Sequence, residues 1–87
     1  MDDRTNDPIA AAQLALGRAL RELRRRAGIT QKELGTRAGA DDTYISQVET
    51  GRRDIRWSTV TRLLRGIDAS LGDLAAEVEK HDPPQKR

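Results

Sequence analysis

Apolar residues recur along this chain at the three- and four-residue spacing of helices with one buried face, in stretches separated by turn-forming residues. The pattern predicts helices over about residues 8–27, 31–38, 42–50, 57–66 and 71–80. We therefore expect an all-α fold of five helices.

A single tight turn separates the two central helices. Gly39 suits the left-handed conformation in which a chain leaves a helix, and Asp41 can accept a hydrogen bond from the NH groups that open the next one. Gly35 costs about 1 kcal/mol relative to alanine inside a helix, so we expect the second of these helices to approach it closely. Two helices joined in this way form a helix-turn-helix.

Other helix starts carry capping residues. Asp7 can accept a hydrogen bond from the NH groups that open the first helix. Pro8 suits the first helical position, because an NH group there would have no partner in the helix. Ser58 is the candidate cap of the fourth helix, which would then begin late. Two starts have the capping-box pattern, a hydroxyl residue followed three positions later by an acid: Thr30 with Glu33, and Ser70 with Asp73.

The apolar stripes identify the expected core. In the first helix the stripe consists of Ile9, Leu16, Leu20, Leu23 and Ala27. In the fourth it consists of Val60, Leu63, Leu64 and Ile67, with Ile55 of the preceding loop beside it, and in the fifth of Leu71, Leu74, Ala75 and Val78. Asp68 suits the left-handed turn between these last two helices. We expect residues 1–7 to be disordered and residues 81–87 to form a flexible tail.

Charge is distributed unevenly along the 87 residues, although the net charge is only +2. Residues 17–65 contain twelve basic and six acidic residues, whereas the flanks contain four basic and eight acidic residues. A basic centre between acidic flanks favours a surface that faces a polyanion. A solvated, arginine-rich helix surface without such a partner would give the same charges.

Several classes of protein are disfavoured by what the sequence lacks. The absence of cysteine excludes disulfides and thiolate-bound metal and is compatible with a reducing cytosol. No apolar run approaches the roughly 20 residues that cross a bilayer, and the acidic start MDDRTND is unlike a signal peptide. We expect a cytoplasmic protein with no membrane partner.

Few residues could perform chemistry or stack on bases. The single histidine, His81, lies in the expected tail, and no nucleophile stands beside a base. We expect no enzyme, no metal and no cofactor. With one tyrosine, one tryptophan and no phenylalanine, the chain has few platforms for single-stranded bases, which favours double-stranded DNA.

The central segment resembles the helix-turn-helix core of the Cro and phage-repressor-like family, also called the xenobiotic-response-element family. The residues that match in type and spacing are Leu34, Gly35, Ala38, Gly39, Ile45 and Val48. The resemblance extends over roughly residues 14–78. It implies a lambda-repressor-like DNA-binding domain of five helices over residues 8–80, with the helix-turn-helix at about 31–50.

The resemblance also implies which residues read bases. Asp42, Thr43 and Gln47 match base-facing positions on the helix that enters the major groove, on the side away from Ile45 and Val48. Gln47 can pair with adenine N6 and N7, and Thr43 can offer its hydroxyl to a base or its methyl to thymine. Asp42 either accepts from cytosine N4 or favours the positive end of its helix.

Tyr44 is expected to contact DNA from the edge of that helix, or to pack half-buried on the preceding one. Contacts to phosphates are implied for a further set: Gln31, Thr50, Arg52, Arg53 and Arg56. An exposed arginine in solvent is the alternative for each basic member.

Three structural roles follow from the same resemblance. Arg24 and Glu49 match an ion pair that links the first helix to the end of the third. Trp57 stands where the family usually has leucine, so we expect it to fill the core, with an interface role as the alternative. Dimerisation is expected through the fifth helix, by Leu71, Leu74 and Val78, with the acids of that helix facing away from DNA.

The sequence therefore predicts a regulator that binds double-stranded DNA as a homodimer on a palindromic operator, associated with a bacterial nucleoid. Its short length and the segments TYIS and ETGRRDI resemble restriction-modification controller proteins. The alternative is an antitoxin or adaptor module whose main partner is another protein.

Overall fold

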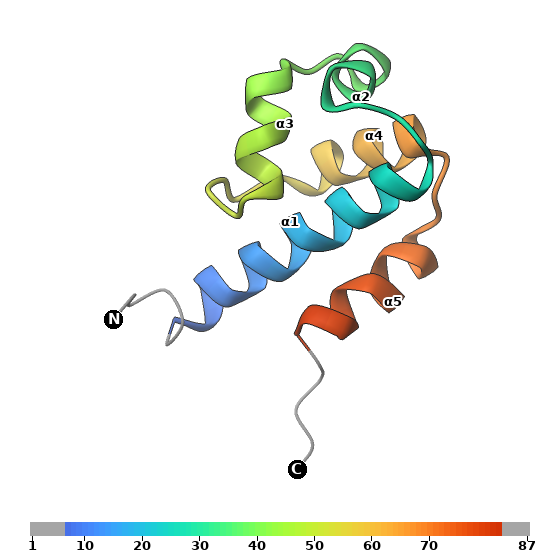
Figure 1. Ribbon diagram of the computed structural model, residues 1–87. Coiled ribbons are helices and arrows are strands. Elements are labelled where there is room, and N and C mark those ends of the chain that lie inside the picture. The colour runs from blue at the N-terminus through green and yellow to red at the C-terminus, as the bar shows by residue number, and fades with distance from the viewer. Residues whose placement is uncertain (1–6, 83–87) are drawn as a thin grey trace.

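The computed structural model describes residues 7–82, and within them the chain forms five helices and no strand. They are α1 (Pro8–Arg26), α2 (Gln31–Ala38), α3 (Asp42–Glu49), α4 (Trp57–Ile67) and α5 (Leu71–His81). α1 passes between α3 and α4 on one side and α5 on the other, while α2 packs on α3 and α4 (Figure 1). The expected all-α fold is confirmed. The expectation of disorder in residues 1–7 and of a flexible tail in 81–87 falls largely outside the described residues, but Asp7 caps α1 and His81 is the last residue of α5, so the prediction is wrong for these two.

Side-chain caps start four of the five helices as predicted. Asp7 accepts from the NH of Ile9 at 2.9 Å, and both capping boxes form. α4 differs, because Arg56 occupies its N-cap without a side-chain hydrogen bond. The prediction that Ser58 caps a late-starting helix is wrong, since Ser58 is already the second residue of α4.

The turn between α2 and α3 has the predicted backbone. Gly39 adopts a left-handed conformation with φ 68°, and the side chain of Asp41 accepts from the NH of Thr43 at 2.7 Å. The reason for Gly35 differs from the expectation. A Cβ on Gly35 would lie 2.4 Å from the carbonyl oxygen of Ala40, so the turn, and not α3, requires its missing side chain.

Thirteen buried apolar residues form one core, to which all five helices and the loop residue Ile29 contribute. Most of the predicted stripes are confirmed in it, with Ile55 packed against its edge. The ends of the α1 stripe are not, because Ile9 is 68% exposed and Ala27 is also exposed, and in the α5 stripe Leu71 and Ala75 lie at the surface. Trp57 is 61% exposed, so the prediction that it fills the core is wrong. It begins α4 at the surface.

A buried acid ties α5 to α1. Glu77 is 3% exposed and accepts hydrogen bonds from Arg26 of α1 and, at 2.9 Å, from Lys80. The Lys80 hydrogen bond, followed by that of Arg26, lowers the pKa of the Glu77 carboxyl below its usual value. The sequence predicts only that Glu77 faces away from DNA; its burial against α1 was not predicted.

Helix α1 crosses α3 in close backbone contact at Gly17. A Cβ built on Gly17 would lie 2.3 Å from the carbonyl oxygen of Val48 and 2.9 Å from that of Glu49. Neither oxygen can rotate away as the end of a side chain could. The packing of α1 on α3 therefore depends on a glycine at this position.

We predict that Gly17→Ala destabilises the protein by about 1–3 kcal/mol, because α1 and α3 must separate to admit the methyl group. The matched control is Gly72→Ala in α5, where the nearest atom to the new Cβ is Ser70 Oγ at 3.6 Å. This control should leave stability unchanged or raise it slightly. Urea denaturation measures both changes, and equal stabilities for the two variants would contradict the prediction.

Candidate nucleic-acid interface

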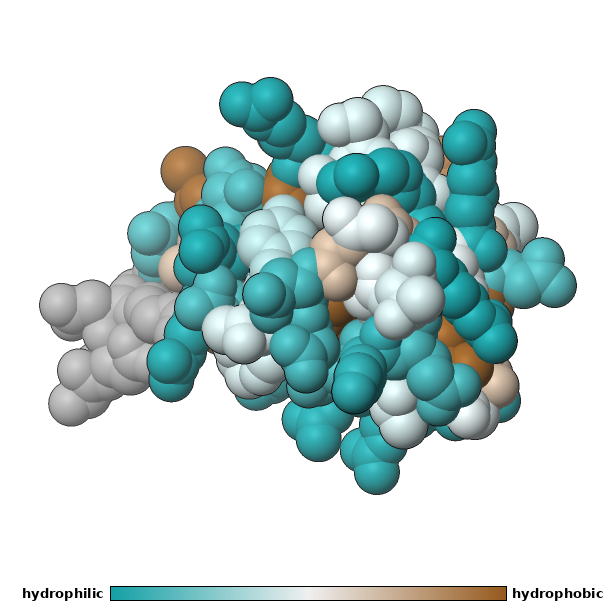
Figure 2. Space-filling model, turned by 90° about the horizontal axis from the view of Figure 1, so that it is seen from above, coloured by the Kyte–Doolittle hydropathy of each residue, from teal (hydrophilic) through white to brown (hydrophobic). Residues whose placement is uncertain are grey.

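Helix α3 turns one face to the core and the other to solvent. Ile45 and Val48 are 1% and 2% exposed, while Thr43 is exposed and Gln47 is half-buried at the surface. Figure 2 looks onto α2 and the beginning of α3 and shows mainly hydrophilic and intermediate residues, with small hydrophobic areas between them. Within residues 7–82, Asp42 and Thr43 on this side of α3 are therefore open to solvent, whereas Gln47 is only partly so.

The beginning of α3 carries two adjacent carboxylates with different roles. Asp41 is the N-cap, and its hydrogen bond from the backbone of Thr43 lowers the pKa of the Asp41 carboxyl. Asp42 is exposed in the first turn, where its charge lies near the positive end of the helix. Asp41 makes the cap, and the side chain of Asp42 is exposed at the surface.

Gln47, Tyr44 and Arg53 form one cluster on the surface of α3. The Arg53 Nε–H donates to Gln47 Oε1 at 2.8 Å, and the guanidinium carbon lies 5.6 Å from the centre of the Tyr44 ring. Sequence reasoning assigned Arg53 to phosphate, independently of the other two. The missed signal is the spacing of Tyr44 and Gln47, three residues apart on one helix face.

The remaining residues expected at phosphates fall into two groups. Gln31 donates through Nε2 to Glu49 at 3.0 Å, and the Thr50 hydroxyl bonds the carbonyls of Ser46 and Gln47. These side chains therefore already have partners within the protein. Arg52 and Arg56, in the loop between α3 and α4, are exposed.

The end of α3 is held by a buried ion pair with α1. Arg24 Nε donates to Glu49 Oε2 at 2.6 Å and Nη2 donates to Oε1 at 3.0 Å, while Nη1 donates to the carbonyl of Ile29 at 2.8 Å. Glu49 is 4% exposed and also accepts from Gln31 at the start of α2. One carboxylate thus connects three helices, and both residues expected to pair do so.

The three residues expected at a dimer interface differ in exposure. Leu71 is 54% exposed at the start of α5, but Leu74 is 4% exposed and belongs to the core of this chain. Val78 packs against that core and is partly buried. The prediction that Leu74 faces a second copy is wrong, since its side chain packs within the chain. Leu71 remains available.

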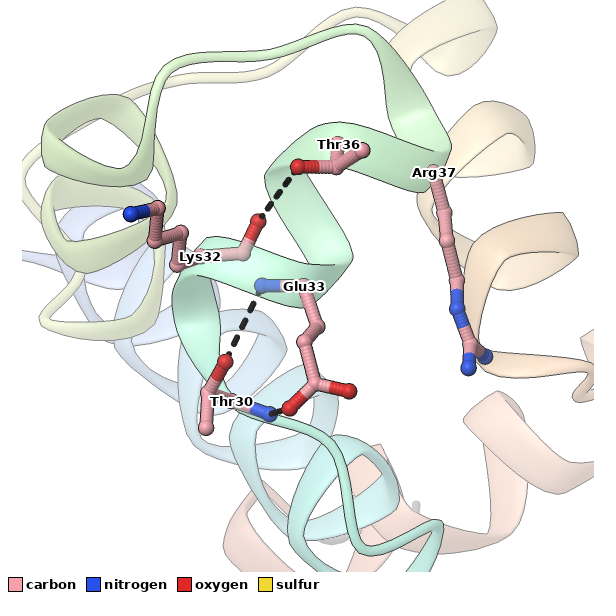
Figure 3. Close-up of a pocket in the computed structure, with 5 residues that line it drawn as sticks. All are labelled: Thr30, Lys32, Glu33, Thr36 and Arg37. Atoms are coloured by element: carbon pink, nitrogen blue, oxygen red, sulfur yellow. Dashed lines mark hydrogen bonds between the residues drawn. The ribbon is translucent and has the colours of Figure 1, made fainter.

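A hollow of about 300 Å³ lies on the outer side of α2, lined by Thr30, Lys32, Glu33, Thr36 and Arg37 (Figure 3). Its polar side chains serve the fold. Thr30 and Glu33 form the capping box, the Thr36 hydroxyl donates to the Lys32 carbonyl, and Arg37 donates to the Gly66 carbonyl of α4. These bonds engage four of the five lining side chains, all but that of Lys32.

Two further features concern residues 7–82 alone. No group of three histidine, cysteine, aspartate or glutamate residues among them is placed to hold a metal ion. None of their helices has the length and apolar character needed to span a bilayer.

Comparison with known proteins adds the family relationship. The sequence pattern of the helix-turn-helix domain matches residues 15–78. The HTH-type transcriptional regulator PuuR of Escherichia coli is 33% identical over 72 residues, which are 83% of this chain but 39% of PuuR. The chain therefore spans about two fifths of the length of that relative.

Two crystal structures resemble the fold. The clp gene regulator ClgR from C. glutamicum superposes with a TM-score of 0.78 at 28% identity, covering 80% of this chain and 90% of the other. The restriction-modification controller protein C.AhdI from Aeromonas hydrophila superposes with a TM-score of 0.68 at 31% identity, covering 71% of this chain and 94% of the other.

We predict that Glu49→Ala lowers the free energy of unfolding by about 3–5 kcal/mol, because it leaves the Arg24 guanidinium buried without its counter-ion. Glu79→Ala, which removes an exposed acid from α5, is the matched control and should change little. Urea denaturation monitored by circular dichroism gives both values. If Glu49→Ala lowers the free energy of unfolding by less than 1 kcal/mol, the prediction that Arg24 is left buried without a counter-ion is contradicted.

Proposed function

This chain belongs to the helix-turn-helix domain family, in its Cro and phage-repressor-like branch, and from that membership we propose that it regulates transcription by binding a specific double-stranded DNA sequence. The observation that carries the proposal is the exposed polar face of α3, whose opposite face is packed in the core. In a helix-turn-helix the second helix enters the major groove with its N-terminal residues toward the bases.

Thr43, Gln47 and Asp42 are the base-reading candidates of this proposal, with Tyr44 at the edge. Thr43 and Asp42 are exposed on the first turn of α3, which is the part of the helix that faces the base edges in this mode of docking. Their chemistry differs, since a hydroxyl both donates and accepts whereas a carboxylate only accepts. Together these two neighbours could distinguish base edges by their donors and acceptors. A uniformly basic helix offers donors only and could not do so.

Phosphate contacts come chiefly from the loop after α3. Arg52 and Arg56 are exposed there, and the loop lies beside the C-terminal end of α3 (Figure 1). The backbone NH groups at the start of α2 would supply a second contact, with Gln31 contributing through the NH₂ hydrogen that its bond to Glu49 leaves over. These groups would hold the protein in register without reading sequence.

We further propose that the protein acts as a homodimer on a palindromic operator, with two recognition helices about 34 Å apart. Leu71, exposed at the start of α5, supports an interface at that end of the molecule. The likeness to C.AhdI supports a controller-type role in which the protein adjusts its own operon in a bacterial cytoplasm. A protein partner in place of DNA is the competing outcome of the tests below.

Selection of bound DNA from a random pool tests the proposal directly. A two-fold symmetric enriched site supports a dimeric regulator, and an enriched site without symmetry supports DNA binding but rejects the palindrome. A pool that shows no enrichment at low salt rejects the proposed function in favour of a protein partner.

We predict that affinity for the selected site falls by orders of magnitude between about 50 and 200 mM salt. Replacing both Arg52 and Arg56 by alanine should reduce the slope of log affinity against log salt by about two, one for each lost phosphate contact. The control is Arg65→Ala, an exposed arginine at the far end of α4, which should keep the slope. Fluorescence anisotropy measures all three, and an unchanged slope in the double variant argues against these contacts.

We predict that Leu71→Glu converts a dimer into a monomer, since it places two carboxylates in an apolar contact. Ile9→Glu is the control, because Ile9 is equally large and 68% exposed but lies at the start of α1. Sedimentation velocity at micromolar concentration separates the two states. If the Leu71→Glu variant is still a dimer, the interface lies elsewhere. If the wild-type protein binds operator DNA as a monomer, the proposed homodimer is rejected.

A further inference from the structure

The orientation of the Gln47 amide is fixed by its neighbour. A guanidinium donates hydrogen bonds and accepts none, so the Gln47 atom that faces the Arg53 Nε–H at 2.8 Å must be the carbonyl oxygen. The amide nitrogen then occupies the other arm of the side chain. No acceptor within residues 7–82 bonds its two hydrogens, which are left for another partner.

Arg53 reaches this position because the chain folds back after α3. Gly51 adopts a left-handed conformation with φ 75°, and the Arg52 NH then donates to the Gln47 carbonyl at 2.9 Å. The next residue, Arg53, therefore runs alongside the last turn of α3. Its guanidinium lies over the Tyr44 ring, which gives the arginine a second contact on the same helix face.

We propose that Arg53 is a specificity-determining residue that holds Gln47 with its NH₂ group outward, so that this cluster reads guanine in preference to adenine. The inference rests on the proposed function, because it concerns the base that α3 would meet in the major groove. It assigns to Arg53 a role in base selection and not only in phosphate contact.

The preference follows from the pattern of donors and acceptors. Adenine presents one acceptor and one donor in the major groove, so a glutamine that pairs with it twice must use its oxygen as well as its nitrogen. Here Arg53 already uses the oxygen. Guanine presents two acceptors, O6 and N7, which match an outward NH₂ group and the remaining NH groups of the guanidinium. Pairing with adenine would require the Arg53 bond to break or to share the oxygen.

The test is selection of bound DNA by the wild-type chain and by four variants. Gln47→Ala identifies the base pair that Gln47 reads, as the position whose preference is lost. Arg53→Lys keeps the positive charge but removes the Nε–H donor and the planar group over Tyr44. Tyr44→Leu removes the ring, and Tyr44→Phe is its matched control, because it keeps the ring and loses only the hydroxyl.

We expect the wild-type site to hold guanine at the position that Gln47→Ala identifies. Arg53→Lys should lower the preference for guanine over adenine there by about tenfold, the size of one bidentate base contact. Tyr44→Leu should lower it in the same direction and Tyr44→Phe should not. Thermal melting checks that each variant is folded, and Arg53 is exposed, so its replacement leaves the core intact.

Three results would overturn the inference. A wild-type site with adenine at that position rejects it without any variant. A uniform loss of affinity in Arg53→Lys, with guanine retained, makes Arg53 a phosphate contact only. In both cases an enriched site leaves the proposed function standing, whereas a pool without enrichment by the wild-type chain removes the function and the inference together.

Discussion

The buried contact between Arg24 and Glu49 determines where helix α3 stands. Two charged groups taken out of water are costly unless their hydrogen bonds are satisfied, and here the guanidinium makes three bonds while the carboxylate accepts from Arg24 and Gln31. A shift of α3 large enough to break these bonds would leave a buried charge unpaired, which is costly. The contact therefore defines geometry more than it adds stability.

Backbone contacts complete this arrangement. Gly17 lets α1 lie directly against the end of α3, and Gly35 lets the turn return over α2. Both contacts involve carbonyl oxygens, which cannot adjust by changing a rotamer. The exposed face of α3 is consequently presented by a body with little freedom to deform, as a surface that matches a fixed groove requires.

The sequence predicts well whatever depends on residues close together in the chain. Helix starts at Asp7 and Thr30, the turn at Gly39 and the left-handed Asp68 follow from local hydrogen bonds and backbone preference. The family assignment is likewise confirmed, because the helix-turn-helix pattern is local.

What the sequence does not predict depends on contacts between distant segments. Leu74 was expected to contact a second copy and Glu77 to face away from DNA, yet packing of α5 on α1 buries both. Trp57 was expected inside but is exposed at the start of α4, which begins two residues earlier than a cap at Ser58 would allow. The bond from Arg53 to Gln47 depends on how a loop folds back, which no helical periodicity describes.

That bond has a consequence for exchanging parts between relatives. The side chain that orients Gln47 belongs to the loop, four residues beyond the end of α3. Grafting α3 alone onto another member of the family would carry Gln47 without the group that orients it. The unit to transfer is therefore the segment from the turn to Arg53. A chimaera joined at Glu49 would take Gln47 from one protein and the residue at position 53 from another.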